Sequence, residues 1–302
     1  MKRTILKFRP RRLSAAAAAF AATVALSQPS PVMAAAADGP ANAAGLAAGS
    51  VPLRVATYNI RGGVGEDGVF DLGRTEAAIR SVDAGVVGLQ EVDVHWRARS
   101  DFADEARRLA DRLKMRVFFA PIYVRPSHVE GAARRQYGVA LLSRYPILRA
   151  ENHEITRLSS RTPNMVQLQT LMPGFAEVTV AVGGMRVHVY STHLDYRHDP
   201  SVRRAQVADM LNVMAPDHGP KVLVGDFNAK PDAPEIAALW QQGLVNVGPN
   251  AGKTYPATRP AKTIDLVTVS PDITVRSARV EATAASDHRP VVSDLLLQQH
   301  GR

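Results

Sequence analysis

The chain has 302 residues, of which 22% are charged, and it contains no cysteine. This composition excludes disulfide bonds, zinc sites built on thiolates and a thiol nucleophile. The formal net charge of +9 overstates the basicity of the domain, because six of the 37 Lys and Arg residues lie in the first 12 residues. The remaining 31 against 28 Asp and Glu leave about +3, which does not by itself indicate binding to nucleic acid or membranes.

The N-terminus has the three parts of a secretory signal peptide. A basic segment is followed by an Ala-rich apolar run from about Leu13 to Leu26 and by Ala-x-Ala sites around Ala34 to Ala37. Because the apolar run is too short to span a bilayer comfortably, we predict a cleaved signal at residues 1–36, with an uncleaved membrane-anchoring helix as the alternative.

The rest of the chain is expected to form one exported domain. Residues 37–50, rich in Ala and Gly, predict a flexible leader, and residues 51–298 are long enough for one large α/β catalytic domain. No later run approaches 18 apolar residues, so we expect no stable membrane insertion after the signal is removed. The product is predicted to be secreted or extracytoplasmic and monomeric.

The first predicted elements of the domain are strands that lead to polar side chains. PLRVATYNI is apolar and β-branched and ends at Asn59, before a glycine-rich loop. That loop matches the glycine spacing of a dinucleotide fingerprint, but Glu66 and Asp67 lie where a pyrophosphate would bind, so a mobile loop is the preferred interpretation. After a predicted helix at residues 73–83, VVGLQEVD indicates a second strand with Glu91 at its end.

The middle of the chain predicts one more helix and a series of strands. Asp101 is expected to cap a helix that runs through Leu113, with Phe102 on its buried side. Strand-like segments VFFAPIYV and YGVALLSRYPI follow. MVQLQTLM, EVTVAV and MRVHVYST are parted by Pro-Gly and Gly-Gly turns, which predicts antiparallel neighbours, and the third leads to His193.

A helix from Ser201 to Met214 follows these strands. Its buried face is predicted to carry Val207. Arg203 lies one turn earlier on the same face, so we expect its side chain to point toward the neighbouring loop.

The last third of the chain begins with VLVGDFNA, a short apolar run that predicts a buried strand followed by a turn. This turn presents Asp226 and Asn228, and a helix is predicted at about 232–242. IDLVTVS (264–270) places Asp265 inside a predicted strand, an unusual position for a charge.

The last motif is SDHRPVVSDLLL, in which Asp287 and His288 immediately precede a final strand. About a dozen strands with only four helices predict two packed sheets flanked by helices.

The predicted strand ends share acids, amides and histidines, namely Asn59, Glu91, His193, Asp226, Asn228, Asp287 and His288. Oxygen and amide ligands without cysteine suit Mg²⁺, with Mn²⁺ or Ca²⁺ as alternatives. Hydrolysis of a phosphate ester needs such a set: a metal to neutralise developing charge, a base for water and donors for the phosphate oxygens.

The motifs, in order, resemble the endonuclease/exonuclease/phosphatase superfamily, which includes deoxyribonuclease I, exonuclease III, neutral sphingomyelinases and inositol polyphosphate 5-phosphatases. They are TYNI, LQEVD, YGVALLSRYPI, STHLD, GDFNA, IDLV and SDHRP, and the resemblance spans Val55 to Leu297. It implies a four-layer α-β-β-α sandwich of two packed mixed sheets flanked by helices, with the site at one end of the sheets.

The resemblance also implies which residues hold the metal. Asn59 and Glu91 would bind it, with Glu91 as the main carboxylate ligand, and Asp287 would complete the metal and base cluster. The expected ion is Mg²⁺.

The catalytic roles are likewise implied by the resemblance. Asp226 would orient or deprotonate the attacking water, and Asn228 and His193 would hold the phosphate. His288 would act in proton transfer, held by Asp265. A catalytic imidazole needs a partner that fixes its tautomer, which gives a physical reason for the acid at Asp265 inside a predicted strand.

The sequence thus predicts an exported, metal-dependent phosphoester hydrolase. A phospholipid headgroup or a small phosphoester is slightly favoured as substrate, because LQEVD and THLD with Arg203 and Gln206 are closer to the sphingomyelinase and phosphoinositide side of the superfamily. Arg203 is a candidate for substrate binding, and pairing with a surface acid is its alternative. A secreted endonuclease or exonuclease and an inert module that binds phosphorylated surfaces stay open as other functions.

Overall fold

The structure is a computed structural model, and it describes residues 49–159 and 168–299. These residues belong to the compact unit Leu46–Arg302. The signal peptide predicted at residues 1–36 and nearly all of the leader predicted at 37–50 lie outside the described residues. Within the described ranges there are twelve strands, four α-helices and two short 3₁₀ turns, and no helix is long and apolar enough to cross a membrane.

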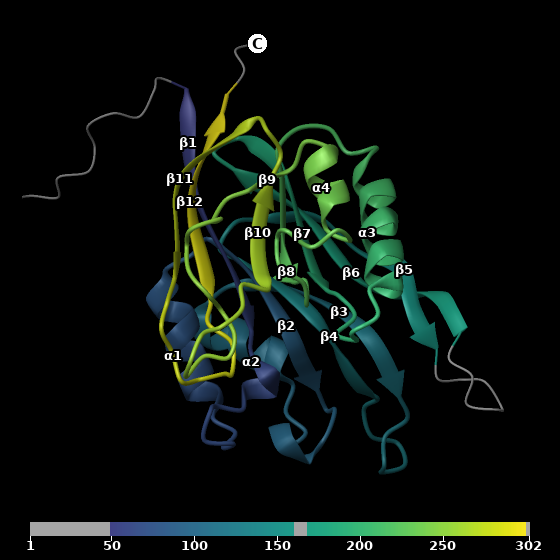
Figure 1. The fold of residues 1–302 in the computed structure, drawn as a ribbon. Coiled ribbons are helices and arrows are strands. Elements are labelled where there is room, and N and C mark those ends of the chain that lie inside the picture. The colour runs from purple at the N-terminus through teal and green to yellow at the C-terminus, as the bar shows by residue number, and fades with distance from the viewer. Residues whose placement is uncertain (1–48, 160–167, 300–302) are drawn as a thin grey trace, which may run out of the picture. The chain divides into compact units, whose positions relative to one another are not determined.

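Two six-stranded mixed sheets form the centre of the fold (Figure 1). The first has the order β11-β12-β1-β2-β4-β3 and consists of β1 (Ser50–Asn59), β2 (Val86–Val94), β3 (Arg116–Arg125), β4 (Arg135–Ser143), β11 (Ile273–Val280) and β12 (Val291–Gln298). The second has the order β5-β6-β7-β8-β10-β9 and consists of β5 (Ile147–Ser159), β6 (Leu168–Val182), β7 (Met185–His193), β8 (Lys221–Asp226), β9 (Val245–Asn246) and β10 (Asp265–Val269).

The main core lies between the two sheets and is built mostly of valine, including Val55, Val178 and Val224. β-branched side chains suit this position because they pack well on a pleated surface. The sheets approach closely at Gly88, where an added Cβ would lie 2.3 Å from the Val224 side chain of the opposite sheet. A glycine is therefore required here by the inter-sheet distance rather than by backbone conformation.

Helices cover the outer face of each sheet (Figure 1). α1 (Leu72–Val82) and α2 (Glu105–Leu113) pack apolar side chains on the first sheet, and α3 (Ser201–Met214) and α4 (Ala237–Gln241) do so on the second. The three apolar clusters thus lie between four successive layers: helices, the first sheet, the second sheet and helices. The predicted α-β-β-α sandwich is confirmed.

Two helices differ from the prediction. α2 begins at Glu105, and the side chain of Asp104 caps it by accepting a hydrogen bond from the backbone of Arg107. Asp101 instead has a left-handed backbone, with φ of 51°, at the end of the 3₁₀ turn Ala98–Ser100, and Phe102 is exposed. The predicted cap at Asp101 was therefore wrong by one turn, because a second acid nearer the helix occupies the capping position.

The predicted helix at 232–242 is reduced to the five residues of α4. Pro234 lies in this segment and lacks the backbone N–H that a helix interior uses, which is consistent with a late helix start.

The Pro-Gly turn predicted after MVQLQTLM is not a turn. Pro173 and Gly174 lie inside the 15-residue strand β6, and the pairing register with β5 shifts between His153 and Glu154. An irregularity of this kind lets one strand accommodate proline and glycine without ending. β5 itself was not predicted, and β6 joins two segments that were predicted as separate strands.

Candidate active site

Three side chains of the second sheet lie side by side at the ends of adjacent strands. His193 is the last residue of β7, Asp226 is the last of β8, and the two are partners in the parallel register. Asp265 is paired with Asp226 on the other side, across the antiparallel β8–β10 ladder. Asp265 is the first residue of β10 rather than an interior one, so its position is a strand end like the others.

The first sheet supplies Asn59 and Glu91. Asn59 is the last residue of β1, as predicted. Glu91 does not end its strand: β2 continues to Val94, and Glu91 lies where its register with β4 shifts, with a left-handed backbone of φ 55°. The bulge turns the Glu91 side chain toward the site while the strand continues, a device common beside active sites.

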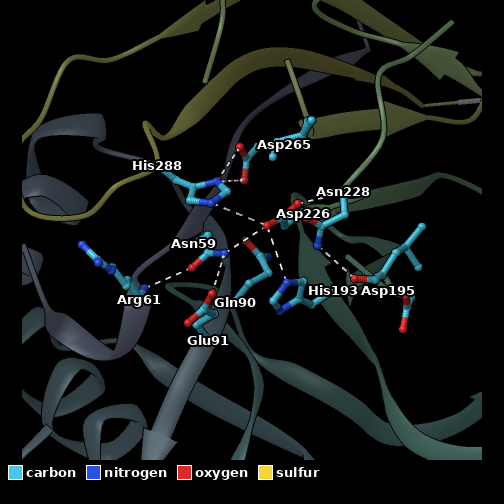
Figure 2. Close-up of polar contacts among 12 residues, drawn as sticks. Asn59, Arg61, Gln90, Glu91, His193, Asp195, Asp226, Asn228, Asp265 and His288 are labelled. Carbon is cyan, nitrogen blue, oxygen red and sulfur yellow. Dashed lines mark hydrogen bonds and ion pairs between the residues drawn. The ribbon is translucent and has the colours of Figure 1, made fainter. Parts of the chain in front are cut away.

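Side chains carried by the two sheets converge on one carboxylate oxygen of Asp226 (Figure 2). The amide of Asn59 donates a 3.0 Å hydrogen bond to Asp226 Oδ2 and lies 3.5 Å from Glu91 Oε1. The Nε2 atoms of His193 and His288 lie 3.6 and 3.8 Å from the same Asp226 oxygen. Side chains from both sheets and from the loop before β12 therefore surround a single carboxylate that is 1% exposed.

Asp265 holds the ring of His288. The imidazole Nδ1 lies 2.9 Å from Asp265 Oδ2 and 3.1 Å from Oδ1, so this nitrogen carries the proton toward the carboxylate and Nε2 faces Asp226. The ring of Tyr255 packs against the imidazole, with centroids 4.7 Å apart. Burial lowers the pKa of His288, but the charge and hydrogen bond of Asp265 raise it more, to about 10. The imidazole is therefore cationic at neutral pH.

The two central carboxyl groups have pKa values shifted in opposite directions. Burial, together with the negative charge of Asp265, raises the pKa of Asp226 above its ordinary value. Burial also acts to raise the pKa of Glu91, but the charges of His193, Arg99 and His288 outweigh it and lower that pKa. Asp226 is thus the better proton acceptor, and Glu91 the permanent anion.

Asn228 and Asp287 lie at the edges of this cluster. The Asn228 amide donates to the Leu194 carbonyl at 3.0 Å, and its backbone N–H donates to Asp226 Oδ1 at 2.9 Å. Its φ of 49° is a left-handed conformation that asparagine tolerates. Asp287 pairs at 3.5 Å with Arg61, and the neighbouring Ser286 hydroxyl donates to the Asn59 carbonyl at 2.7 Å. The loop that carries Asp287 is therefore fastened to the end of β1.

Arg203 is not part of the cluster. Its side chain is buried and donates from Nε and Nη2 to Glu235 Oε1 at 3.0 and 2.8 Å, and from Nη1 to the carbonyls of Asp195 and Arg197. Every nitrogen of the guanidinium is thus engaged within the protein. This geometry makes Arg203 a support for the loop after β7, and the substrate-binding role predicted for it is not retained.

Sequence reasoning missed several neighbours of the site. Arg99 bridges Glu91 at 3.3 Å and Asp93 at 3.0 Å, and Gln90 crosses between the sheets to the Ser191 hydroxyl at 3.2 Å. Gln90 directly precedes Glu91 in LQEVD, so the motif itself contained a signal. Arg99 lies in the 3₁₀ turn Ala98–Ser100, whose sequence has no distinguishing pattern, and only the folded structure brings it to Glu91.

The donor set at this site fits a hard divalent cation. Glu91 Oε1 faces the site with only the long 3.5 Å contact to Asn59 among the described residues. The carboxylates of Glu91 and Asp226 converge here, with Asp287 at the rim, and no thiolate is available. The Asn59 amide directs its nitrogen at both carboxylates, and its oxygen accepts a 3.0 Å hydrogen bond from the Arg61 backbone N–H. Such oxygen-rich sets are the ligands that Mg²⁺ and Mn²⁺ prefer.

Comparisons with known proteins agree with the fold. Residues 56–288 match the model of the Endonuclease/Exonuclease/phosphatase family. The uncharacterized protein YbhP of Escherichia coli K12 is 27% identical over 266 residues, which cover 81% of this chain and 96% of YbhP.

Solved structures give the same result. An endonuclease/exonuclease/phosphatase from Beutenbergia cavernae has a TM-score of 0.69 and 28% identity, covering 82% of this chain and 72% of its own. The mannosyl-6-phosphatase Bt3783 of Bacteroides thetaiotaomicron shares the fold, with a TM-score of 0.59, 18% identity and coverage of 80% and 99%. The chain belongs to the endonuclease/exonuclease/phosphatase family, whose members are hydrolases of phosphoesters.

Proposed function

We propose that this protein is an exported, divalent-metal-dependent phosphoester hydrolase. The observation that carries the proposal is the convergence of Asn59, His193 and His288 on one buried oxygen of Asp226. A buried carboxylate with a raised pKa, surrounded by amide and imidazole donors, is suited to water activation beside an anionic substrate.

Asp226 is the group that acts on water. It accepts the proton of the attacking water as the new bond to phosphorus forms and the bond to the leaving oxygen breaks. His288 is cationic at neutral pH and is held by Asp265, so it can stabilise negative charge on the phosphate and supply a proton to the leaving oxygen.

Two further residues orient the phosphate. His193 lies beside Asp226 in the strand register, and the Asn228 amide is fixed by the Leu194 carbonyl on one side, so both can direct N–H groups at phosphate oxygens. Neutral or cationic donors are needed here because the substrate is an anion. A carboxylate in place of either would repel it.

Asn59, Glu91 and Asp287 would hold the cation. Mg²⁺ is the expected ion, with Mn²⁺ or Ca²⁺ as alternatives, and when bound it would neutralise the charge that develops on the phosphate. Arg99 keeps Glu91 ionised and oriented for this task through its 3.3 Å contact.

The substrate classes are a small phosphoester, a phospholipid headgroup or nucleic acid. The first two are favoured by the motifs, and a secreted endonuclease or exonuclease is the alternative. Export is proposed from the signal-like N-terminus, and sequencing the N-terminus of the protein recovered from the extracellular or periplasmic fraction tests it. An unprocessed chain in the cytoplasm would contradict it.

The decisive test is hydrolysis of p-nitrophenyl phosphate and bis(p-nitrophenyl) phosphate with Mg²⁺. We expect activity that EDTA abolishes and added Mg²⁺ or Mn²⁺ restores, and that Asp226→Ala loses. Asp111→Ala is the matched control, because Asp111 is an exposed acid on α2. Activity that survives EDTA or Asp226→Ala would overturn the proposal. Normal metal binding without turnover of any phosphoester in a broad panel would favour the inert binding module.

A further inference from the structure

A cavity of about 380 Å³ opens beside His193, and His288 is not part of its lining. We call it the arginine pocket, because Arg97, Arg125, Arg157 and Arg197 line it together with a single acid, Asp195. A cavity of this size holds a small ligand group of a few rings or phosphates. Its wall includes His193, so a group bound there lies next to a residue that the proposed function assigns to the reacting phosphate.

The pocket carries an excess of positive charge. Asp195 is already paired with Arg197, which leaves three of the four arginines without neutralisation by that acid. Low-dielectric walls strengthen the field of clustered charges of one sign. The pocket is therefore built for an anion and repels a cationic group such as a choline headgroup.

Arg157 is the most informative of these arginines. Its side chain is buried, and it donates hydrogen bonds to the carbonyls of Pro173, His193 and Gly174, at 3.1 to 3.3 Å. No carboxylate of the described chain pairs with it. Burial of a cation with no carboxylate in contact is costly, and it lowers the pKa of Arg157 to about 10 although the charge of Asp195 acts in the opposite direction. An anionic ligand would supply the missing charge, and two of its five N–H groups have no partner among the described residues.

Aromatic rings form one wall of the pocket. The ring of Tyr137 lies 5.7 Å from that of Trp96 and 6.1 Å from that of Tyr123, and the guanidinium of Arg125 lies 5.1 Å above the Trp96 ring. The Tyr123 ring also stacks with that of Trp96, at 6.5 Å, and the residue is still 38% exposed, so part of this side chain is accessible to a flat group. A tyrosine face beside guanidinium groups is suited to a planar or sugar-ring moiety that carries a phosphate.

From these observations we infer that the arginine pocket binds a second phosphate of the substrate, carried on a ring that lies against Tyr123. The substrate is thus a phosphoester with two anionic groups, of which one reacts at Asp226 and the other is held by Arg125 and Arg157. This inference rests on the proposed function. The same chemistry occurs in a nucleotide with a second phosphate and in a phosphorylated inositol headgroup, so the test must distinguish the two sources.

The kinetic test compares substrates that differ only in the second phosphate. The pairs are 5′-AMP and adenosine 3′,5′-bisphosphate, thymidine dinucleotide with and without a 5′-phosphate, and vesicles of phosphatidylinositol and phosphatidylinositol 4-phosphate. We expect kcat/KM to be at least about 10-fold higher for the doubly charged member of a pair that is turned over, because one charge-assisted contact is worth about that factor. The pair that shows it identifies the source.

Variants of the arginine pocket then test whether its residues cause the preference for the doubly charged substrate. Arg125→Gln, at the exposed side of the pocket, and Arg157→Lys should each reduce the preference about 10-fold, through KM. Arg125→Gln should leave kcat on the singly charged member unchanged. Arg186→Gln is the matched control, since Arg186 is exposed at the opposite end of β7 from His193. If Arg157→Lys does not fold, Arg125→Gln still decides the matter. Equal turnover of both members in every pair, or a preference unchanged by Arg125→Gln, overturns the inference.

A binding measurement separates this inference from the proposed function. Trp96 contributes to the pocket and Trp240 does not, so in a Trp240→Phe background the tryptophan fluorescence reports the pocket alone. Adenosine 3′,5′-bisphosphate should change this signal saturably, and Arg125→Gln should weaken the response. An enzyme that hydrolyses p-nitrophenyl substrates but gives no saturable response refutes the pocket and leaves the function intact. A response without any hydrolysis supports the pocket and refutes the function.

Discussion

Removing the charge of Arg203 should destabilise the fold rather than weaken substrate binding. The Arg203–Glu235 pair is 2.8 Å long, and both side chains are 7% exposed. Breaking a buried ion pair by removing one partner costs about 3–5 kcal/mol, because the other charge stays buried without compensation. In a domain of this size about 2–4 °C is lost per kcal/mol, so Arg203→Gln should lower the Tm by about 6–20 °C.

The assay is a double-mutant cycle on thermal unfolding, with kinetics measured alongside. Glu235→Gln should also lower the Tm, and the double variant should lose less than the sum of the single variants, since neither charge is then left alone. Arg204→Gln, at an exposed position next along α3, is the control and should leave the Tm unchanged.

The dependence on pH has a defined sign. Burial acts to raise the pKa of Glu235, but its hydrogen bond with Arg203 lowers it below the ordinary value. The pair therefore contributes stability above the pKa of an unfolded glutamate, about 4.3, and this contribution is lost as the pH falls through the lower folded value. If Arg203→Gln left the Tm within about 1 °C of wild type and raised KM, Arg203 would bind substrate and the structural explanation would be refuted.

Three further outcomes are expected. Asn228→Asp should lower kcat by about 100-fold, because it replaces the amide that donates to the Leu194 carbonyl with an anion near the phosphate. Full activity in a steady-state assay would show that Asn228 does not belong to the site. Glu105→Gln should unfold at a higher temperature than wild type, by a margin that grows from pH 4.5 to 8. Burial raises the pKa of Glu105 in the folded protein. In the wild type, the stability contributed by the protonated carboxyl group is therefore complete below the unfolded pKa of about 4.3 and is lost as the pH rises through the folded pKa. A Tm difference between Glu105→Gln and wild type that is independent of pH would contradict this. Gly88→Ala should lower the urea midpoint by the equivalent of about 1–3 kcal/mol, since its Cβ would meet Val224; an unchanged midpoint would show that the sheets can separate locally.

Much of the fold could be predicted because its signals are local. The apolar run before Asp226 and the turn residues after it indicate a strand end without knowledge of any other part of the chain. The same holds for Asn59 at the end of β1 and for α3, whose predicted bounds agree with the structure. The number of such strands then predicted two packed sheets.

What the sequence did not reveal depends on contacts between distant residues or on backbone conformation. No feature of residue type distinguishes the bulge at Glu91 from a strand end, since only the pairing with β4 shows it. Arg203 meets Glu235, 32 residues away, so its partner could not be inferred from the spacing on α3. The arginine pocket draws its lining from several strands and loops, and no single segment carries its signature.

The hydrogen bond between Asn59 and Asp226 depends on the alignment of the two sheets, because Asn59 ends a strand of one sheet and Asp226 ends a strand of the other. A slide of one sheet over the other by about 1 Å would leave every strand paired but would break this 3.0 Å contact. Alignment of the sheets is set by the valine core, far larger than the site itself. On heating, the proposed activity should therefore decrease while the circular dichroism of the strands is still intact, because the two sheets lose their alignment before the protein unfolds.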